Sequence, residues 1–258
     1  MNKNDISIQL YTARNFQPYS SILNFFSKSG IVNIELFGLE SLNIEEFKVM
    51  MESSNISSKS THVGFESLKD SANIIERAKK INIQHVIVPA PPARGDNFKD
   101  QFSMNEEEWT EFGKNLSSHV SRFEDSGLTL GYHNHSYEFI PLRSGKLPIE
   151  CMMENNENLK FEIDLGWAIA GGVDQKPWIE KYSKKFIACH LKDFFDKDKD
   201  MLDHDNQSPV GEGFVDWKEI MDSIKQTNCE LFILEHDDPK DYKGYVSQSL
   251  NFLSNLEI

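Results

Sequence analysis

The chain of 258 residues has few cysteines, little positive charge and no long hydrophobic run. Its three cysteines, Cys151, Cys189 and Cys229, lie far apart and form no Cys-x-x-Cys pair, so neither a disulfide framework nor a thiolate zinc site is indicated. No segment approaches the roughly 18 apolar residues of a membrane span, and the first apolar run is too short for a signal peptide. We therefore expect a cytoplasmic protein that does not bind membranes.

Lysine and arginine are outnumbered, because 27 basic residues against 41 acidic ones give a formal net charge of −14. Contacts to phosphate backbones need Lys and Arg, so this balance argues against a nucleic-acid partner. The basic residues also form no cluster beyond isolated pairs such as Lys79-Lys80. With 39% hydrophobic residues, the chain can build a large core, and a small or neutral ligand is the partner that this composition favours.

A glycine-rich nucleotide loop is also missing, since Gln9-Leu10-Tyr11-Thr12-Ala13-Arg14 follows the first apolar run where Gly-x-Gly-x-x-Gly would be expected. Short, unbroken apolar runs recur along the chain and predict strands that are buried on both faces. The predicted strands are Ile6–Leu10, Ile31–Leu36, Ser57–His62, His85–Val88, Leu128–His133, Lys160–Asp164, Phe186–His190 and Glu230–Glu235.

Segments with a period near 3.6 residues lie between these runs and predict helices. Ser103 and Glu106 match a capping box ahead of the helix that contains Trp109, and Asp216 is a predicted N-cap of a later helix. Alternating strands and helices indicate a parallel sheet of the α/β class, and eight such units have the size of a (β/α)8 TIM barrel. We predict that residues 1–258 form one such domain, with a doubly wound sheet as the alternative.

The chemistry of such a barrel lies at the carboxyl ends of its strands. Each polar residue there could also be a helix cap or a buried hydrogen-bond partner. Carboxylates and neutral imidazoles that converge at one barrel mouth, however, are what a divalent metal needs. The polar residues at the predicted strand ends are Gln9, Glu35, His62, His133-Asn134-His135, Asp164, His190 and Glu235-His236-Asp237.

Several of these strand ends lie in motifs that carry a family resemblance over nearly the whole chain. The chain resembles the xylose isomerase-like barrel superfamily, and within it the sugar phosphate isomerase/epimerase group. The matching stretches are Ile34–Gly38, Leu130–Phe139, Phe161–Trp167, His190–Asp193, Val210–Trp217 and Leu234–His236.

The resemblance implies a metal site with Glu, Asp, His and Glu ligands for Mn²⁺, Mg²⁺, Co²⁺ or Zn²⁺. Asp164, His190 and Glu235 match the last three ligands. Where many relatives have the first Glu, this chain has His133. The resemblance leaves two candidates for the missing ligand, and we expect Glu138, just beyond in the loop, to supply it in preference to His133.

This departure also affects the mechanism that the resemblance implies. In epimerases of this group, two Glu ligands flank the substrate and exchange protons with its carbon. A divalent cation stabilises the enediolate that forms when a proton next to a carbonyl is removed. Glu235 is therefore expected to be one acid/base and Glu138 the other, with His135 or His133 as the alternative partner.

The remaining expected site residues are substrate contacts. By resemblance, His62 and His135 would contact substrate hydroxyls at the mouth, and His133 is also expected among the substrate-binding residues. Lys192 could hold an oxyanion or pair with the nearby Asp193, and Trp167 could form an apolar wall for a sugar ring or belong to the core. Glu212, between two glycines, is expected to reach the mouth from a loop.

The sequence thus predicts a metal-dependent carbohydrate isomerase or epimerase that works through an enediolate. The alternative is a sugar or keto-acid dehydratase or lyase that uses the same metal site. A metal phosphoesterase and a non-catalytic sugar-binding barrel are less favoured. The expected partner is a small sugar or sugar derivative, and a homo-oligomer is compatible with the resemblance. The sugar, its phosphorylation, the metal and the number of subunits do not follow from the sequence.

Overall fold

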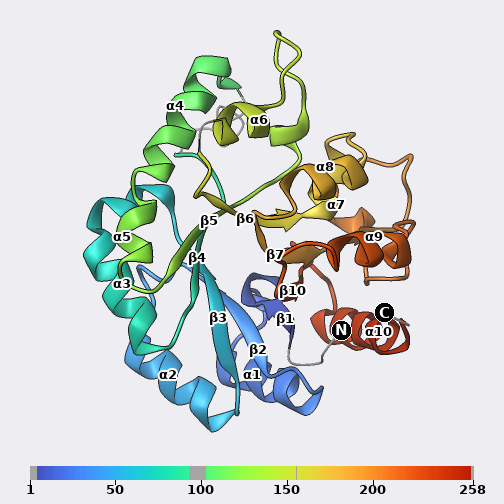
Figure 1. Cartoon of the computed structure of the whole chain (residues 1–258). Helices are drawn as coiled ribbons and strands as arrows, with labels where there is room; N and C mark the ends of the chain where they lie inside the picture. The colour runs from blue at the N-terminus through green and yellow to red at the C-terminus, as the bar shows by residue number, and fades with distance from the viewer. Residues whose placement is uncertain (1–4, 93–102, 155, 257–258) are drawn as a thin grey trace.

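Eight parallel strands close into a barrel in this computed structural model, which describes residues 5–92, 103–154 and 156–256. Around the ring the strands follow the order β1-β10-β7-β6-β5-β4-β3-β2, and helices surround them (Figure 1). The predicted α/β class and (β/α)8 TIM barrel are confirmed. The barrel strands are β1 Ile6–Gln9, β2 Asn33–Phe37, β3 Ser57–His62, β4 His85–Val88, β5 Thr129–His133, β6 Lys160–Asp164, β7 Phe186–Leu191 and β10 Leu231–Leu234.

The predicted strands agree closely with the observed ones. Strands β3, β4 and β6 match at both ends, and the other five differ by one or two residues at one or both ends. Short apolar runs such as His-Val-Ile-Val in β4 are buried throughout, because the barrel interior covers one face of the strand and the helices cover the other. The carboxyl ends of all eight strands therefore meet at one mouth.

Most of the helices on the outside begin at an Asn or Asp N-cap, whereas α1, α5 and α6 have no side-chain cap. The predicted cap Asp216 is confirmed, since its side chain accepts a hydrogen bond from Glu219 N at 3.1 Å. The predicted capping box at Ser103 is wrong: Asn105 and Glu108 form it, because each side chain accepts from the other's backbone N–H, at 3.0 and 2.8 Å. The helices are α1 Tyr19–Lys28, α2 Ile44–Ser53, α3 Ser71–Lys80, α4 Glu106–Ser117, α5 Val120–Glu124, α6 Pro148–Met153, α7 Leu165–Ala170, α8 Gln175–Tyr182, α9 Trp217–Ile224 and α10 Tyr242–Asn255.

Close packing between helices depends on glycine at one position in particular. Gly113 in α4 is buried against α6, and a Cβ atom built there would lie 2.0 Å from the backbone oxygen of Met152. Such a contact is far inside van der Waals distance, so only glycine allows the two helices to approach this closely. Among the helices of the described residues, none is long and apolar enough to cross a membrane.

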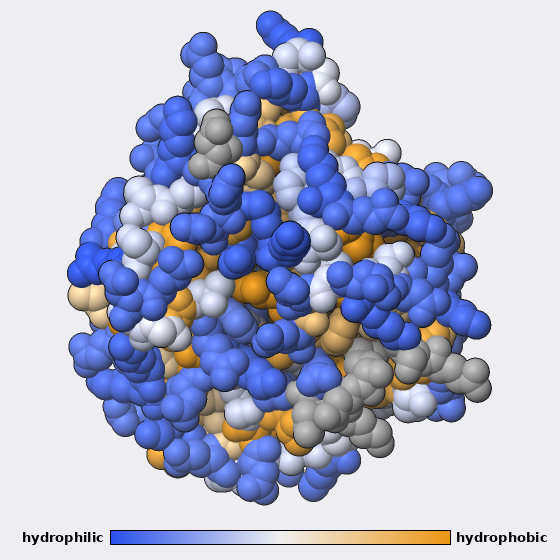
Figure 2. Space-filling view, in the orientation of Figure 1, coloured by the Kyte–Doolittle hydropathy of each residue, from blue (hydrophilic) through white to orange (hydrophobic). Residues whose placement is uncertain are grey.

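Loops beyond the strands build the mouth of the barrel. They include the short 3-10 helices η2 Leu10–Ala13 and η5 Tyr137–Phe139, and the small antiparallel pair β8 Asp193–Phe194 and β9 Gln207–Ser208. Polar residues cover most of the molecular face in Figure 2, and hydrophobic residues are visible between them toward the middle. The hydrophobic core is built by residues of the barrel strands and of the helices around them, whereas the mouth combines polar and aromatic side chains.

Candidate metal site at the barrel mouth

A cavity of about 610 Å³ lies at the carboxyl ends of the barrel strands. This volume falls in the range of about 300–1,000 Å³ that small-molecule sites occupy. The rings of Tyr11, Phe37 and Tyr137 form part of its wall. The predicted site residues that line the cavity are His62, His133, His135, Trp167 and Glu235.

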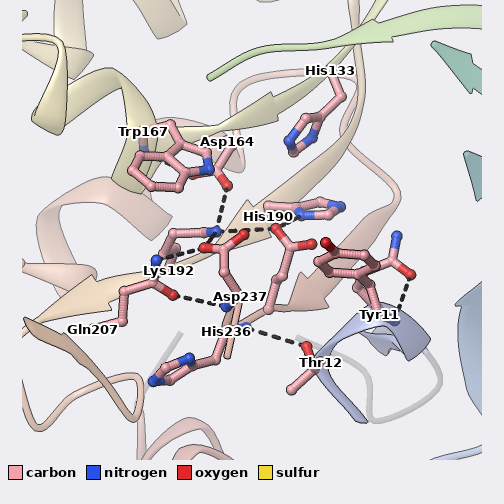
Figure 3. A network of polar contacts seen from close by, with 12 residues as sticks. Tyr11, Thr12, His133, Asp164, Trp167, His190, Lys192, Gln207, His236 and Asp237 are labelled. Atoms are coloured by element: carbon pink, nitrogen blue, oxygen red, sulfur yellow. Dashed lines mark hydrogen bonds and ion pairs between the residues drawn. The ribbon is translucent and has the colours of Figure 1, made fainter. Parts of the chain in front are cut away.

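Four buried side chains converge at this mouth from neighbouring strands. His133 ends β5, Asp164 ends β6, His190 lies in β7 and Glu235 directly follows β10. One ligand atom from each of the four lies within 4.8 Å of the others. The parallel register puts Asp164 directly beside His190, and Figure 3 shows these two and His133 turned toward a shared space. The strand ends thus bring two imidazoles and two carboxylates together.

A buried lysine connects this group with a third carboxylate. Lys192 Nζ lies 2.5 Å from Asp237 Oδ2, 3.2 Å from Glu235 Oε2 and 3.7 Å from Asp164 Oδ2 (Figure 3). The same ammonium lies 4.5 Å from the centre of the Trp167 ring, which is a cation–π distance. Lys192 is fully buried, so these groups replace water as its partners.

Burial and charge together shift the pKa values of these groups. Burial raises the pKa of Asp164 to about 7, although Lys192 and His190 oppose the rise. Burial also favours a higher pKa for Glu235, but the charges of Lys192 and His190 hold it below its usual range. Burial disfavours the charge of Lys192, yet Asp237, Glu235 and Asp164 outweigh it and raise the pKa of the ammonium. Lys192 is therefore a cation and Glu235 an anion at neutral pH.

The four converging residues fit a divalent cation. Asp164 Oδ2 is buried and has no hydrogen-bond partner among the described residues, since Lys192 Nζ lies 3.7 Å away from it. Leaving a buried carboxylate oxygen without a hydrogen bond is costly, and a cation would remove that cost. Two imidazole nitrogens and two carboxylate oxygens form a donor set that suits Zn²⁺, Mn²⁺ or Co²⁺.

Glu138, the expected fourth ligand, lies apart from this group. Its carboxylate is fully buried in η5, where Oε1 accepts from the Tyr132 hydroxyl at 2.5 Å and Oε2 accepts from His135 N at 2.9 Å. Burial raises the pKa of Glu138 to about 8. Both of its oxygens are thus engaged in holding the loop after β5. Contrary to our expectation, the geometry favours His133 over Glu138 as the fourth ligand.

The other predicted residues differ in their relation to the cavity. The His135 ring stacks on Tyr137 at 5.5 Å between centroids, and burial lowers the pKa of His135 to about 4, which keeps the imidazole neutral. Trp167 is largely buried but still lines the cavity. Glu212 is exposed on the loop after β9 and does not line it, contrary to our expectation. The loop turns because Glu212 N donates to the Pro209 carbonyl at 3.0 Å.

Sequence reasoning missed a second layer of polar residues below the mouth. Glu162 lies two residues before Asp164 on β6, and its Oε1 is 2.6 Å from His62 Nε2, 3.0 Å from His190 Nε2 and 3.2 Å from His133 Nδ1. Burial disfavours the charged form of His62, but the carboxylates of Glu35 and Glu162 raise its pKa to about 10. Strand alternation was the signal that could have found Glu162, since residues two apart face the same side.

Comparison with known proteins agrees with this architecture. A closed parallel barrel with buried polar residues at its carboxyl end defines a (β/α)8 barrel protein. The chain belongs to the xylose isomerase-like TIM barrel family, whose model matches residues 24–256. No curated protein matches the chain.

Solved structures of similar fold include several barrels at low sequence identity. A sugar phosphate isomerase/epimerase from Parabacteroides distasonis ATCC 8503 has a TM-score of 0.78 and 18% identity, covering 100% of this chain and 96% of that one. The probable 3-DHS dehydratase AsbF from Bacillus anthracis has a TM-score of 0.76 and 14% identity, over 97% and 99% of the two chains. The IolI protein with a bound zinc atom has a TM-score of 0.74 and 15% identity, over 98% and 97%. These likenesses concern the fold.

Proposed function

We propose that the protein is a metal-dependent isomerase or epimerase of a small sugar. The observation that carries the proposal is the convergence of His133, Asp164, His190 and Glu235 at the cavity, with a buried Asp164 oxygen that lacks a hydrogen-bond partner among the described residues. Structural neighbours named as sugar phosphate isomerase/epimerases support the same reaction class.

His133, Asp164, His190 and Glu235 would hold the cation. A bound divalent cation supplies positive charge that stabilises the negative charge developing on substrate oxygens during proton removal. Nitrogen ligands favour Zn²⁺, Mn²⁺ or Co²⁺ over Mg²⁺, which prefers oxygen. The zinc atom in the similar IolI protein agrees with this choice.

Glu235 is the residue we assign to proton transfer with the substrate carbon. Its side chain lines the cavity and is held ionised by Lys192, whose ammonium lies 3.2 Å away. An ionised carboxylate can accept a proton from a carbon next to a carbonyl. A second proton carrier is needed for epimerisation, and the neutral imidazole of His135, which also lines the cavity, is our candidate.

The cavity wall accounts for substrate binding in this proposal. Trp167 and Tyr11 offer aromatic surfaces, while His62 offers an imidazole to a hydroxyl group. Glu138 has an indirect role. Its carboxylate accepts a hydrogen bond from His135 N and so holds the loop that carries the His135 imidazole.

A dehydratase or lyase is the second candidate. Such a reaction begins with the same proton removal and then expels a leaving group from the neighbouring carbon. The similar fold of the probable dehydratase AsbF supports this alternative, as does the presence of a second proton carrier, His135, beside the cavity. An isomerase exchanges the substrate proton and loses no substituent, whereas a dehydratase or lyase expels a leaving group.

Solvent deuterium exchange tests the proposal. The Mn²⁺-loaded protein is incubated in D2O with a panel of ketoses and ketose phosphates, and ¹H NMR follows the C–H next to the carbonyl. We expect exchange and an isomeric product with at least one sugar, no exchange with Asp164→Ala, and unchanged exchange with Asp222→Ala, which alters an exposed carboxylate. An elimination product would favour the lyase. Sugar binding without any exchange would favour a non-catalytic binding barrel, and hydrolysis of a phosphodiester without exchange would favour a phosphoesterase.

A further inference from the structure

Glu35 lies inside the barrel, below the four proposed ligands, and has no part in the function proposed above. It sits in the middle of β2, and none of its surface is exposed. Its Oε2 accepts a hydrogen bond from Gln9 Nε2 at 2.8 Å and lies 2.8 Å from His190 Nε2. A charge buried this deeply is costly unless its partners are fixed, so these contacts need an explanation.

Gln9 holds this carboxylate in one orientation. The amide oxygen of Gln9 accepts from Tyr11 N at 3.1 Å, which leaves the amide NH2 to face Glu35. Register pairing of β1 with β2 sets Gln9 directly beside Glu35. The carboxylate is therefore fixed from one side before it contacts the histidine on the other.

His190 is contacted through both ring nitrogens. Its Nδ1 lies 3.0 Å from Glu235 Oε2, on the side of the proposed ligands, whereas Nε2 lies 2.8 Å from Glu35 Oε2. A neutral imidazole that gives a lone pair to a metal through one nitrogen must carry its proton on the other. A carboxylate that accepts this second proton fixes the tautomer and the ring orientation and makes the ligand more basic.

We propose that Glu35, held by Gln9, is a positioning residue that keeps the His190 proton on Nε2 and so sets the affinity for the divalent ion. The inference rests on the proposed function, in that His190 serves as a metal ligand. Glu162 Oε1 also lies 3.0 Å from this nitrogen, and Glu35 Oε2 lies 3.2 Å from His62 Nε2. The contact of Glu35 with His190 Nε2 is the shorter of the two at 2.8 Å, whereas the shortest contact of Glu162 is with His62 Nε2 at 2.6 Å.

Metal affinity of the full chain tests the role of Glu35. Zn²⁺ and Co²⁺ are titrated into metal-free protein by calorimetry, with folding of each variant checked by circular dichroism. We expect Glu35→Gln to bind roughly 10–100-fold more weakly than wild type, as is usual when a carboxylate behind a metal-binding histidine is removed. The variant Gln9→Met keeps the Glu35 carboxylate but removes the hydrogen bond that orients it. We expect it to bind Zn²⁺ and Co²⁺ more weakly than wild type, but less so than Glu35→Gln does.

The matched control is Glu40→Gln, the same substitution in the loop after β2. Glu40 accepts a hydrogen bond from Gly64 N at 3.3 Å, and no hydrogen bond or ion pair between Glu40 and a histidine is found among the described residues. We expect this variant to bind Zn²⁺ as wild type does. The visible absorption of bound Co²⁺ adds a second readout, because a reoriented His190 changes the ligand field whereas a merely destabilised fold does not.

The outcomes separate this inference from the proposed function. Wild-type and Glu35→Gln proteins that bind Zn²⁺ equally well would refute the positioning role and leave the metal site standing. A wild-type protein that binds neither ion would refute the proposed function and the inference together. Two ions per chain would also overturn the inference, because the carboxylates below the mouth would then be ligands themselves. If Glu35→Gln fails to fold, Gln9→Met tests the inference instead. A Gln9→Met protein that binds Zn²⁺ as tightly as wild type would refute the role of Gln9 in holding Glu35.

Discussion

Removing the charge of Lys192 tests how the carboxylates at the mouth are stabilised. The ammonium lies 2.5 Å from Asp237, 3.2 Å from Glu235 and 3.7 Å from Asp164, and the side chain is fully buried. Lys192→Met keeps an unbranched apolar side chain but removes the ammonium, and with it the cation–π contact with Trp167. It leaves three carboxylates, two of them buried, without their shared cation.

The expected loss of stability is large. Removing one partner of a buried ion pair costs about 3–5 kcal/mol. For a chain of this size each kcal/mol lowers the thermal midpoint by about 2–4 °C, so the metal-free variant should melt roughly 6–20 °C below wild type. A divalent ion brings positive charge to Asp164 and Glu235, so added Zn²⁺ should raise the midpoint of Lys192→Met more than that of wild type.

Differential scanning fluorimetry with and without Zn²⁺ measures both effects. Lys240→Met is the control, because Lys240 is exposed and pairs with Asp205 on the surface at 2.8 Å. Surface ion pairs contribute little, so its midpoint should match that of wild type. A metal-free Lys192→Met protein that melts within about 2 °C of wild type would refute the argument that Lys192 stabilises the carboxylates.

The remaining predictions concern the fourth ligand, a buried carboxyl and a close helix contact. His133→Ala should weaken Zn²⁺ binding by at least about tenfold in calorimetry while Glu138→Gln leaves it unchanged, and the reverse result would return the ligand role to Glu138. Because burial raises the pKa of Glu138 from 4.5 to about 8, the folded state binds its proton more tightly, and this group's contribution to stability is lost as pH rises through that range. Urea unfolding at both ends of this pH range should show a smaller fall in the free energy of unfolding for Glu138→Gln than for wild type. An equal fall in the two proteins would contradict a buried neutral carboxyl at Glu138. Gly113→Ala adds a Cβ 2.0 Å from Met152 O and should cost about 1–3 kcal/mol or more in urea unfolding, whereas a Cβ at Gly64 meets no atom closer than 3.5 Å and Gly64→Ala should cost far less.

The barrel could be predicted because its strands carry a strong local signal. Runs such as Phe-Ile-Ala-Cys-His in β7 are short and largely buried, whereas longer helices such as α1 and α3 bury one face and expose the other. Once strands are assigned, their ends are assigned too, so His62, Asp164 and His190 could be expected at the mouth. Helix starts were harder to predict, because Ser103 and Asn105 are both good N-caps, and the structure has Asn105 in that position.

Loop side chains were the part of the site that sequence reasoning misjudged. Glu138 lies in a loop, and its direction depends on the Tyr132 hydroxyl, a contact that no spacing rule predicts. Glu212 was expected at the mouth, but the buried Asp193 carboxylate fixes its loop by accepting from Gly211 N and Val215 N at 3.0 and 3.2 Å. The Asp193 contacts join residues 18 and 22 apart in the chain, and the Glu138 contact depends on the direction of a side-chain hydroxyl, so the local sequence pattern does not predict them.

The second layer was missed for a different reason. The strand-end rule predicts site residues only at the last position of a strand. Glu162 lies two residues earlier in β6, on the same face as Asp164 and one layer deeper in the barrel. Glu35 was noted only as a strand end, because its partners Gln9 and His190 come from other strands of the barrel. Alternation along a strand, applied to every polar residue inside the barrel, would have found both carboxylates.

An anomalous difference map from crystals grown with Zn²⁺ tests the central claim most directly, with data collected on both sides of the zinc absorption edge. We predict one strong peak at the mouth, about 2.0–2.2 Å from a nitrogen or oxygen of His133, Asp164, His190 and Glu235. A peak bound by Glu138 instead of His133 would contradict the ligand set. Zinc found only on the molecular surface would contradict the metal site itself.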